Sequence, residues 1–232
     1  MTHTTTIITG TTTGTTTGTE LLRLLAWLSP AFPTGGFAYS HGLEWAVEVG
    51  DVTTATQLQG WLADTLHHGA GRSDAVALRL AHAAHARPGV LARIAAVSLA
   101  AQPARERRDE ALNQGRAFLL AARCWGAQAA DWPHAVAVGA LCGAHGIAAD
   151  AATQAWLHAL CANLISAAVR LVPLGQSDGL RVLAALEPQI LAVAATSQAD
   201  AQEGLDALGG ACLRSDIAAM RHETQYTRLF RS

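Results

Sequence analysis

Apolar residues recur three and four positions apart along nearly the whole chain, and this spacing restricts the fold more than any other feature. Runs that alternate apolar and polar residues, as half-buried strands do, are almost absent. The β-branched residues are sparse after Thr56, while alanine and leucine are abundant. The pattern therefore predicts an all-α protein.

Helix start and stop signals divide the chain into about ten segments. Prolines 88, 103 and 133 each stand where a first helical turn accepts them, and Thr54 with Gln57 has the spacing of a capping box. The connections are short, so residues 20–232 are expected to form one domain. The expected helices are 21–28, 39–49, 54–68, 73–86, 88–101, 103–129, 133–146, 150–171, 177–196 with a kink or restart at Pro188, and a short one from 215.

Residues 1–19 differ from the rest of the chain because they consist mainly of threonine and glycine. They lack the basic start and the continuous apolar run of a signal peptide. The glycines at spacing four are separated by threonine, whereas a membrane dimerisation motif needs apolar neighbours. We expect a flexible, disordered leader, no membrane segment and a cytoplasmic location.

Charge and residue type exclude several classes of function. The formal net charge of −2 lacks the basic excess of a nucleic-acid-binding protein. All 16 basic residues are arginine, so neither a Walker phosphate-binding loop nor a lysine Schiff base can form. Only 15% of residues are charged and the mean hydropathy is +0.21, which favours apolar surface buried between two copies of the chain. A homodimer is therefore expected.

Candidate chemical groups are few. His82 and His85 lie one turn apart on an expected helix and could supply half of a zinc or nickel site, but an exposed polar face explains them as well. The four cysteines are far apart in apolar helical surroundings, as buried reduced thiols are. No nucleophile, base and oxyanion donor come together in the sequence. We interpret the chain as a non-enzyme with no catalytic, cofactor-binding or metal-binding residues.

Two charged groups are interpreted as solvent-facing. Glu44 and Glu48 share a helix face and could act as acid and base, although solvated carboxylates are the preferred interpretation. The run RERRDE, residues 105–110, mixes signs at a spacing of four, as an exposed helix does.

The segment PTGGFAYSHGLE, residues 33–44, predicts a shaped turn. It places Gly35, Gly36, Phe37 and Tyr39 close together. One interpretation is a tight turn between helices, packed by its own aromatic side chains. The other is a loop presented at a protein interface, where Tyr and Phe make strong contacts.

The last twelve residues are unusually rich in anchors for a chain terminus. Residues 221–232 place Tyr226, Leu229 and Phe230 among three arginines. Burial of three apolar side chains cannot offset the conformational entropy of twelve ordered residues. We therefore expect the tail to be mobile in the isolated chain and ordered by a partner, with a strap folded onto its own domain as the alternative.

Four stretches together resemble the UreF family of urease accessory proteins. They are LSPAFPTGGFAYSHGLE, ARERRDEALNQGR, NLISAAVRLVPLGQSDG and MRHETQYTRLFRS, in the order of that family, and the resemblance runs from Glu20 to Ser232. It implies an all-α, dimeric, non-enzymatic protein. It also implies a complex with UreD (also called UreH) and the GTPase UreG, which docks on apo-urease and assists nickel insertion.

In that family the C-terminal segment engages UreD. The resemblance thus implies a contact set in this chain, namely Arg221, His222, Glu223, Tyr226, Arg228, Leu229, Phe230 and Arg231. Two alternatives remain open at this point: a direct nickel carrier that uses His82 and His85, and a regulator of the UreG GTPase that acts through an arginine.

Overall fold

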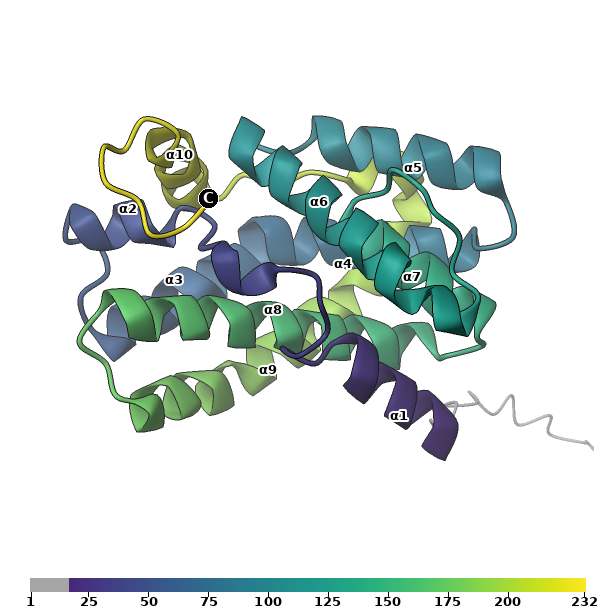
Figure 1. Cartoon of the computed structure of the whole chain (residues 1–232), viewed down its shortest axis with the longest axis horizontal. Helices are drawn as coiled ribbons and strands as arrows, with labels where there is room; N and C mark the ends of the chain where they lie inside the picture. The colour runs from purple at the N-terminus through teal and green to yellow at the C-terminus, as the bar shows by residue number, and fades with distance from the viewer. Residues whose placement is uncertain (1–16) are drawn as a thin grey trace, which may run out of the picture.

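The computed structural model describes residues 17–232 and confirms the all-α class, because no strand occurs within that range. The helices form one body in which α4 lies at the centre (Figure 1). The α-helices are α1 (Gly18–Trp27), α2 (Leu43–Glu48), α3 (Ala55–His68), α4 (Ala70–Ala83), α5 (Pro88–Ala100), α6 (Arg105–Ala121), α7 (His134–Ala144), α8 (Ala149–Leu171), α9 (Gln176–Asp200) and α10 (Leu213–His222), with short 3-10 helices η1 (Gly36–Ala38), η2 (Ala122–Trp125) and η3 (Ala201–Ala207).

Close helix contacts in the core depend on small residues. Helix α4 packs against α3, α5, α7, α8 and α9. At the contact with α7, a Cβ on Gly139 would lie 2.2 Å from the carbonyl oxygen of Leu78. The abundance of alanine and glycine therefore lets the central helices approach one another closely.

Several predicted helix boundaries are confirmed, and others are wrong. The helix expected from residue 39 begins at Leu43, because Gly42, with φ of +77°, precedes it in a left-handed conformation. The Thr54 hydroxyl accepts a hydrogen bond from the Gln57 amide at 3.2 Å at the start of α3, and Pro88 opens α5. The helix expected to reach residue 129 ends at Ala121, because a short 3-10 turn and then Gly126, with φ of +85°, end it. Helix α9 continues through Pro188 without a restart.

The predicted leader boundary also needs a correction. Most of residues 1–19 lie outside the described residues, but Thr17 already caps α1, and Gly18 begins that helix. The Glu20 amide donates to the Thr17 hydroxyl, and the Glu20 carboxylate accepts from the Thr17 amide, which forms a capping box. Residues 17–19 therefore belong to the helical domain.

One helical stretch in the described chain, residues 176–207, is long and apolar enough to cross a bilayer by length and composition alone. Core helices of globular proteins meet the same criteria. This stretch packs against α3, α4 and α8, and Gly204, with non-helical backbone angles, interrupts it.

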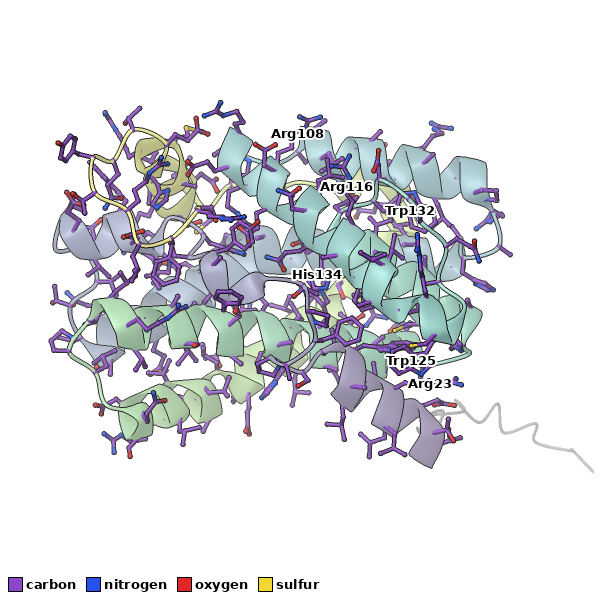
Figure 2. The ribbon with its side chains drawn as sticks, viewed as in Figure 1. Arg23, Arg108, Arg116, Trp125, Trp132 and His134 are labelled. Atoms are coloured by element: carbon purple, nitrogen blue, oxygen red, sulfur yellow. The ribbon has the colours of Figure 1, made fainter. Side chains whose placement is uncertain are left out.

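Aromatic side chains fill the core below α6. Trp27 and Phe118 are almost fully buried and pack edge to face. His134 lies beside Phe118 between α6 and α8 (Figure 2), and burial lowers its pKa to about 4, so the ring is neutral. Among the cysteines Cys124 is exposed, which corrects the expectation that all four are buried.

Candidate functional site

The structure brings the two candidate segments of the sequence together. Residues 223–232, called the strap here, follow α10, run back over α2 and end beside the 33–44 turn (Figure 1). The Arg231 amide donates to the carbonyl of Ala38 at 2.8 Å, and the Ser40 amide donates to the carbonyl of Ser232 at 2.7 Å. The strap therefore pairs with the turn backbone to backbone.

Glu44 is the main anchor of the strap. Its carboxylate accepts hydrogen bonds from the Leu229 amide at 2.6 Å and the Phe230 amide at 2.9 Å. It lies 3.1 Å from Nε2 of His222 as well. Glu44 is only 7% exposed, so the interpretation of this residue as a solvated surface carboxylate is wrong.

A second anchor lies at the start of α6. Glu106 Oε2 lies 2.6 Å from Nδ1 of His222, and Glu106 Oε1 accepts from Arg228 at 2.6 Å. In return, Glu223 Oε1 accepts from the Arg105 amide at 2.7 Å and so supplies the side-chain cap that Ala104 cannot provide. The strap and α6 therefore stabilise each other.

Glu110 forms the third anchor, one turn further along α6. It accepts from the Ser232 hydroxyl at 2.6 Å, from His41 Nε2 at 2.8 Å and from Arg107. Burial alone would raise the pKa of Glu110, but Arg107, His41 and the Ser232 hydroxyl together hold it at about 2. Arg107 and Glu110 are buried, so the RERRDE run is not wholly solvent-facing as predicted.

His41 is held in an unusual backbone conformation. It has a φ of +57°, in the left-handed region that residues other than glycine rarely adopt. Burial lowers its pKa, and so does the Arg107 charge, although Glu110 acts in the opposite direction. The next residue, Gly42, has φ of +77° and touches the backbone of α10, where a Cβ would lie 2.5 Å from the Ala219 nitrogen. The turn thus packs against α10 as well as against the strap.

The front of the turn contacts α8. The Asn163 side-chain amide donates to the carbonyl of Gly36 at 3.0 Å. Arg170 donates to the carbonyl of Phe37 at 2.8 Å, and its guanidinium lies 4.4 Å from the ring centre of Phe230. Tyr39 is buried, whereas Phe37 is 70% exposed. The turn is therefore both a packed connection between helices and a loop presented to solvent. The exposed Arg170 links the turn to the strap.

These contacts contradict the expectation of a mobile tail in the isolated chain. Of the three apolar anchors only Phe230 is buried, and hydrogen bonds to Glu44, Glu106 and Glu110 order the strap instead. The expectation is wrong because the domain itself supplies the hydrogen bonds that were expected from a partner, and hydrogen bonds to charged groups contribute about 1.5–3 kcal/mol each. The alternative, a strap folded onto its own domain, is what the structure shows.

Other residues of the predicted contact set remain available to a partner. Tyr226 is fully exposed, Leu229 is 65% exposed, and Arg221, Arg228 and Arg231 also face solvent. Sequence reasoning missed a neighbouring feature on α10, an exposed apolar stripe of Leu213, Ile217 and Met220. Their spacing of four and three could have revealed it.

The candidate metal pair is engaged in local hydrogen bonds. His82 Nε2 lies 2.7 Å from the carbonyl oxygen of Ile147, and His85 Nδ1 lies 3.0 Å from the carbonyl oxygen of His82. Within residues 17–232 no three metal-ligating side chains gather at one point. A cavity of about 40 Å³ between α4, α6 and α10 has room for water but not for an organic substrate.

The charged outer side of α6 carries Arg108 and Arg116 (Figure 2). Arg116 pairs with Asp131 at 2.7 Å at an exposed position. Such exposed pairs contribute little to stability. This side of the helix is a solvated face, so the prediction made for the run 105–110 holds for Arg108 but not for Arg107 and Glu110.

Comparison with known proteins gives consistent matches. A family model described as UreF matches residues 52–187. Proteins named urease accessory protein UreF from Bradyrhizobium sp. strain BTAi1 and Rhodopseudomonas palustris strain TIE-1 are 49% and 48% identical to this chain, over 91% of it and 92% of each relative. A protein of the same name from Methylorubrum populi is 47% identical over 92% of this chain and 99% of its own length.

Proposed function

The chain belongs to the UreF family of urease accessory proteins, and from this membership we propose that it is a non-enzymatic scaffold for assembly of the urease nickel centre. Its proposed partners are UreD (UreH), the GTPase UreG and apo-urease, and its proposed location is the cytoplasm. GTP hydrolysis would reside in UreG, in keeping with the absence of lysine from this chain.

One observation carries this proposal, the exposed residues on an ordered strap. Tyr226 and Leu229 project from a backbone that α2 and α6 hold in place, and the α10 stripe ends shortly before the strap begins. Exposed aromatic and aliphatic side chains on a fixed backbone lose little entropy when a partner covers them. The arrangement suits a polypeptide partner, and we assign UreD to it.

A second part of the proposal is a homodimer. Outside the strap, Leu180 and Leu191 on α9 are more than half exposed, and α9 carries few charges on its outer side. These residues favour a second copy of the chain as the partner on that side.

Co-purification with UreD tests the role of the strap. The substitution Leu229→Asp removes an exposed side chain but keeps the amide that Glu44 holds, so the fold should persist. Loss of UreD from the complex is the expected result. The matched control is Leu25→Asp, a similarly exposed leucine on α1, away from both the strap and the proposed dimer surface.

Two outcomes decide the matter. Retention of UreD by the Leu229→Asp variant at the wild-type level would refute the strap as its docking surface. Loss of UreD from both variants would show that a general surface effect, rather than the strap, governs the complex.

A further inference from the structure

A polar cavity of about 40 Å³ lies beside the 33–44 turn. Five polar side chains that line it are His41 of the turn, Ser73 of α4, Arg107 of α6, and Ser215 and Asp216 of α10. By the same measure one water molecule needs about 10–15 Å³, so the cavity has room for roughly three. A bound water also needs about two to four polar partners, and these side chains can supply them.

One of the residues that line the cavity has a polar atom without a partner. His41 is buried, and its Nε2 lies 2.8 Å from Glu110 Oε1. Its Nδ1 is buried as well and has no hydrogen-bond partner among residues 17–232. A buried nitrogen without a hydrogen bond destabilises the folded state, whichever tautomer the ring adopts. Because water can both donate and accept, a water molecule at Nδ1 satisfies either tautomer.

Arg107 and Asp216 both line the cavity, but they do not pair directly. Burial raises the pKa of Asp216, while the Cys212 amide and the Arg107 charge lower it, so the arginine acts on this carboxyl. The direct ion pair of Arg107 is with Glu110, and the structure describes none between Arg107 and Asp216. Water can join two polar groups that are too far apart for a direct hydrogen bond.

Helix α10 is turned the opposite way from an ordinary surface helix. Its apolar stripe of Leu213, Ile217 and Met220 is more than half exposed, whereas Ser215 and Asp216 line the cavity. A surface helix normally turns its apolar face to the core. Water in the cavity explains how these polar residues are accommodated on the inner side of α10.

We propose that the cavity is a water-binding site, in which ordered water molecules join α10 to the 33–44 turn and to α6. One water contacts His41 Nδ1, and the others link it to Arg107 and Asp216. The waters thereby complete the contacts of the helix that carries the exposed apolar stripe.

Nuclear Overhauser spectroscopy of the isolated full-length protein tests this site without any partner, so the result is independent of the proposed scaffold role. The probe is water itself, and the reporter is the carbon-bound Hε1 of His41, which lies next to Nδ1. A water that stays bound for longer than the protein takes to tumble gives laboratory-frame and rotating-frame cross-peaks of opposite sign. Such a pair of cross-peaks at Hε1 is the expected result, and its absence would overturn the proposal.

Displacement of the waters is the second test. Ala101 also lines the cavity, so the side chain of Ala101→Leu should fill it. The matched control is Ala92→Leu, at an exposed position on α5. Deuterium magnetic relaxation dispersion, which counts long-lived waters, should show at least one fewer in Ala101→Leu than in the control. The urea midpoint of Ala101→Leu should also be the lower of the two, because the polar atoms lose their water partners.

Equal numbers of long-lived waters in the two variants would overturn the proposal. A higher urea midpoint for Ala101→Leu than for Ala92→Leu would do so as well, since filling a dry cavity stabilises a protein. If Ala101→Leu does not fold, the cross-peaks at His41 Hε1 of the wild-type protein decide alone.

Discussion

A methyl group added at Gly42 should dislodge α10 from α2. The comparison that isolates this effect is Gly42→Ala against Gly50→Ala. Both glycines have left-handed φ, +77° and +82°, so both substitutions carry the same backbone strain. A Cβ at residue 50 would meet nothing within 4 Å, whereas one at residue 42 would lie 2.5 Å from the Ala219 nitrogen and 2.8 Å from its Cα.

The expected costs follow from these distances. Left-handed backbone at a residue other than glycine costs about 1–2 kcal/mol, which is the whole effect at residue 50. At residue 42 the methyl group must in addition move α10 by roughly 1 Å to reach ordinary contact distance. Overpacking of this kind costs about 1–3 kcal/mol more. The Gly42 variant should therefore lose roughly 2–5 kcal/mol, and the Gly50 variant about 1–2 kcal/mol.

Urea denaturation followed by tryptophan fluorescence measures both values. Trypsin digestion of the folded proteins shows where the loss is localised, because only the Gly42 variant should become susceptible after Arg214 and Arg221 of α10. Equal loss of stability in the two variants, with α10 equally protected, would refute the claim that this glycine seats the helix.

Two further substitutions test the core. Gly139→Ala should destabilise the protein by about 1–3 kcal/mol, because its Cβ would overlap Leu78 of α4. Gly60→Ala, in open space on α3, should stabilise the protein by up to about 1 kcal/mol. Urea denaturation measures both changes, and the same sign for both would contradict the packing argument. Burial raises the pKa of Asp74 to about 7 from 3.8, so its contribution to stability is present below pH 4 and is lost as pH rises through 7. The free energy of unfolding of Asp74→Asn should therefore match that of the wild type near pH 4 and exceed it at pH 8 by roughly 1–3 kcal/mol. This difference is smaller than full burial would give, because the side chain is partly exposed. A stability difference that does not change with pH would exclude this carboxyl as the cause.

Local signals in the sequence were enough to predict the fold class and most helix starts. The apolar spacing, the cap at Thr54 and the proline at 88 act within a few residues, and their effects survive in the folded protein. The predicted end of α6 lies too far along the chain because the left-handed turn at Gly126 carries no signal beyond a single glycine.

The contacts of the strap could not be predicted from local spacing. The partners Glu44 and Leu229 are 185 residues apart, and Glu106 and Arg228 are 122 apart. Periodicity within a helix says which face is apolar, but it does not say which carboxylate a distant backbone amide will meet. For the same reason the helical spacing predicts surface positions for Glu44 and Glu110, although both are buried. The anchor residues and the family resemblance both draw attention to the C-terminal segment, but only the fold shows which residues it contacts.

The pairing of Ser40 with Ser232 spans 192 residues and so closes nearly the whole chain into a ring. Contacts of such long sequence separation form only after the intervening segments are in place. The corner made by the 33–44 turn, α10 and the strap is therefore the last part to assemble, and its amides should be among the first to exchange with solvent deuterium while the central helices remain closed.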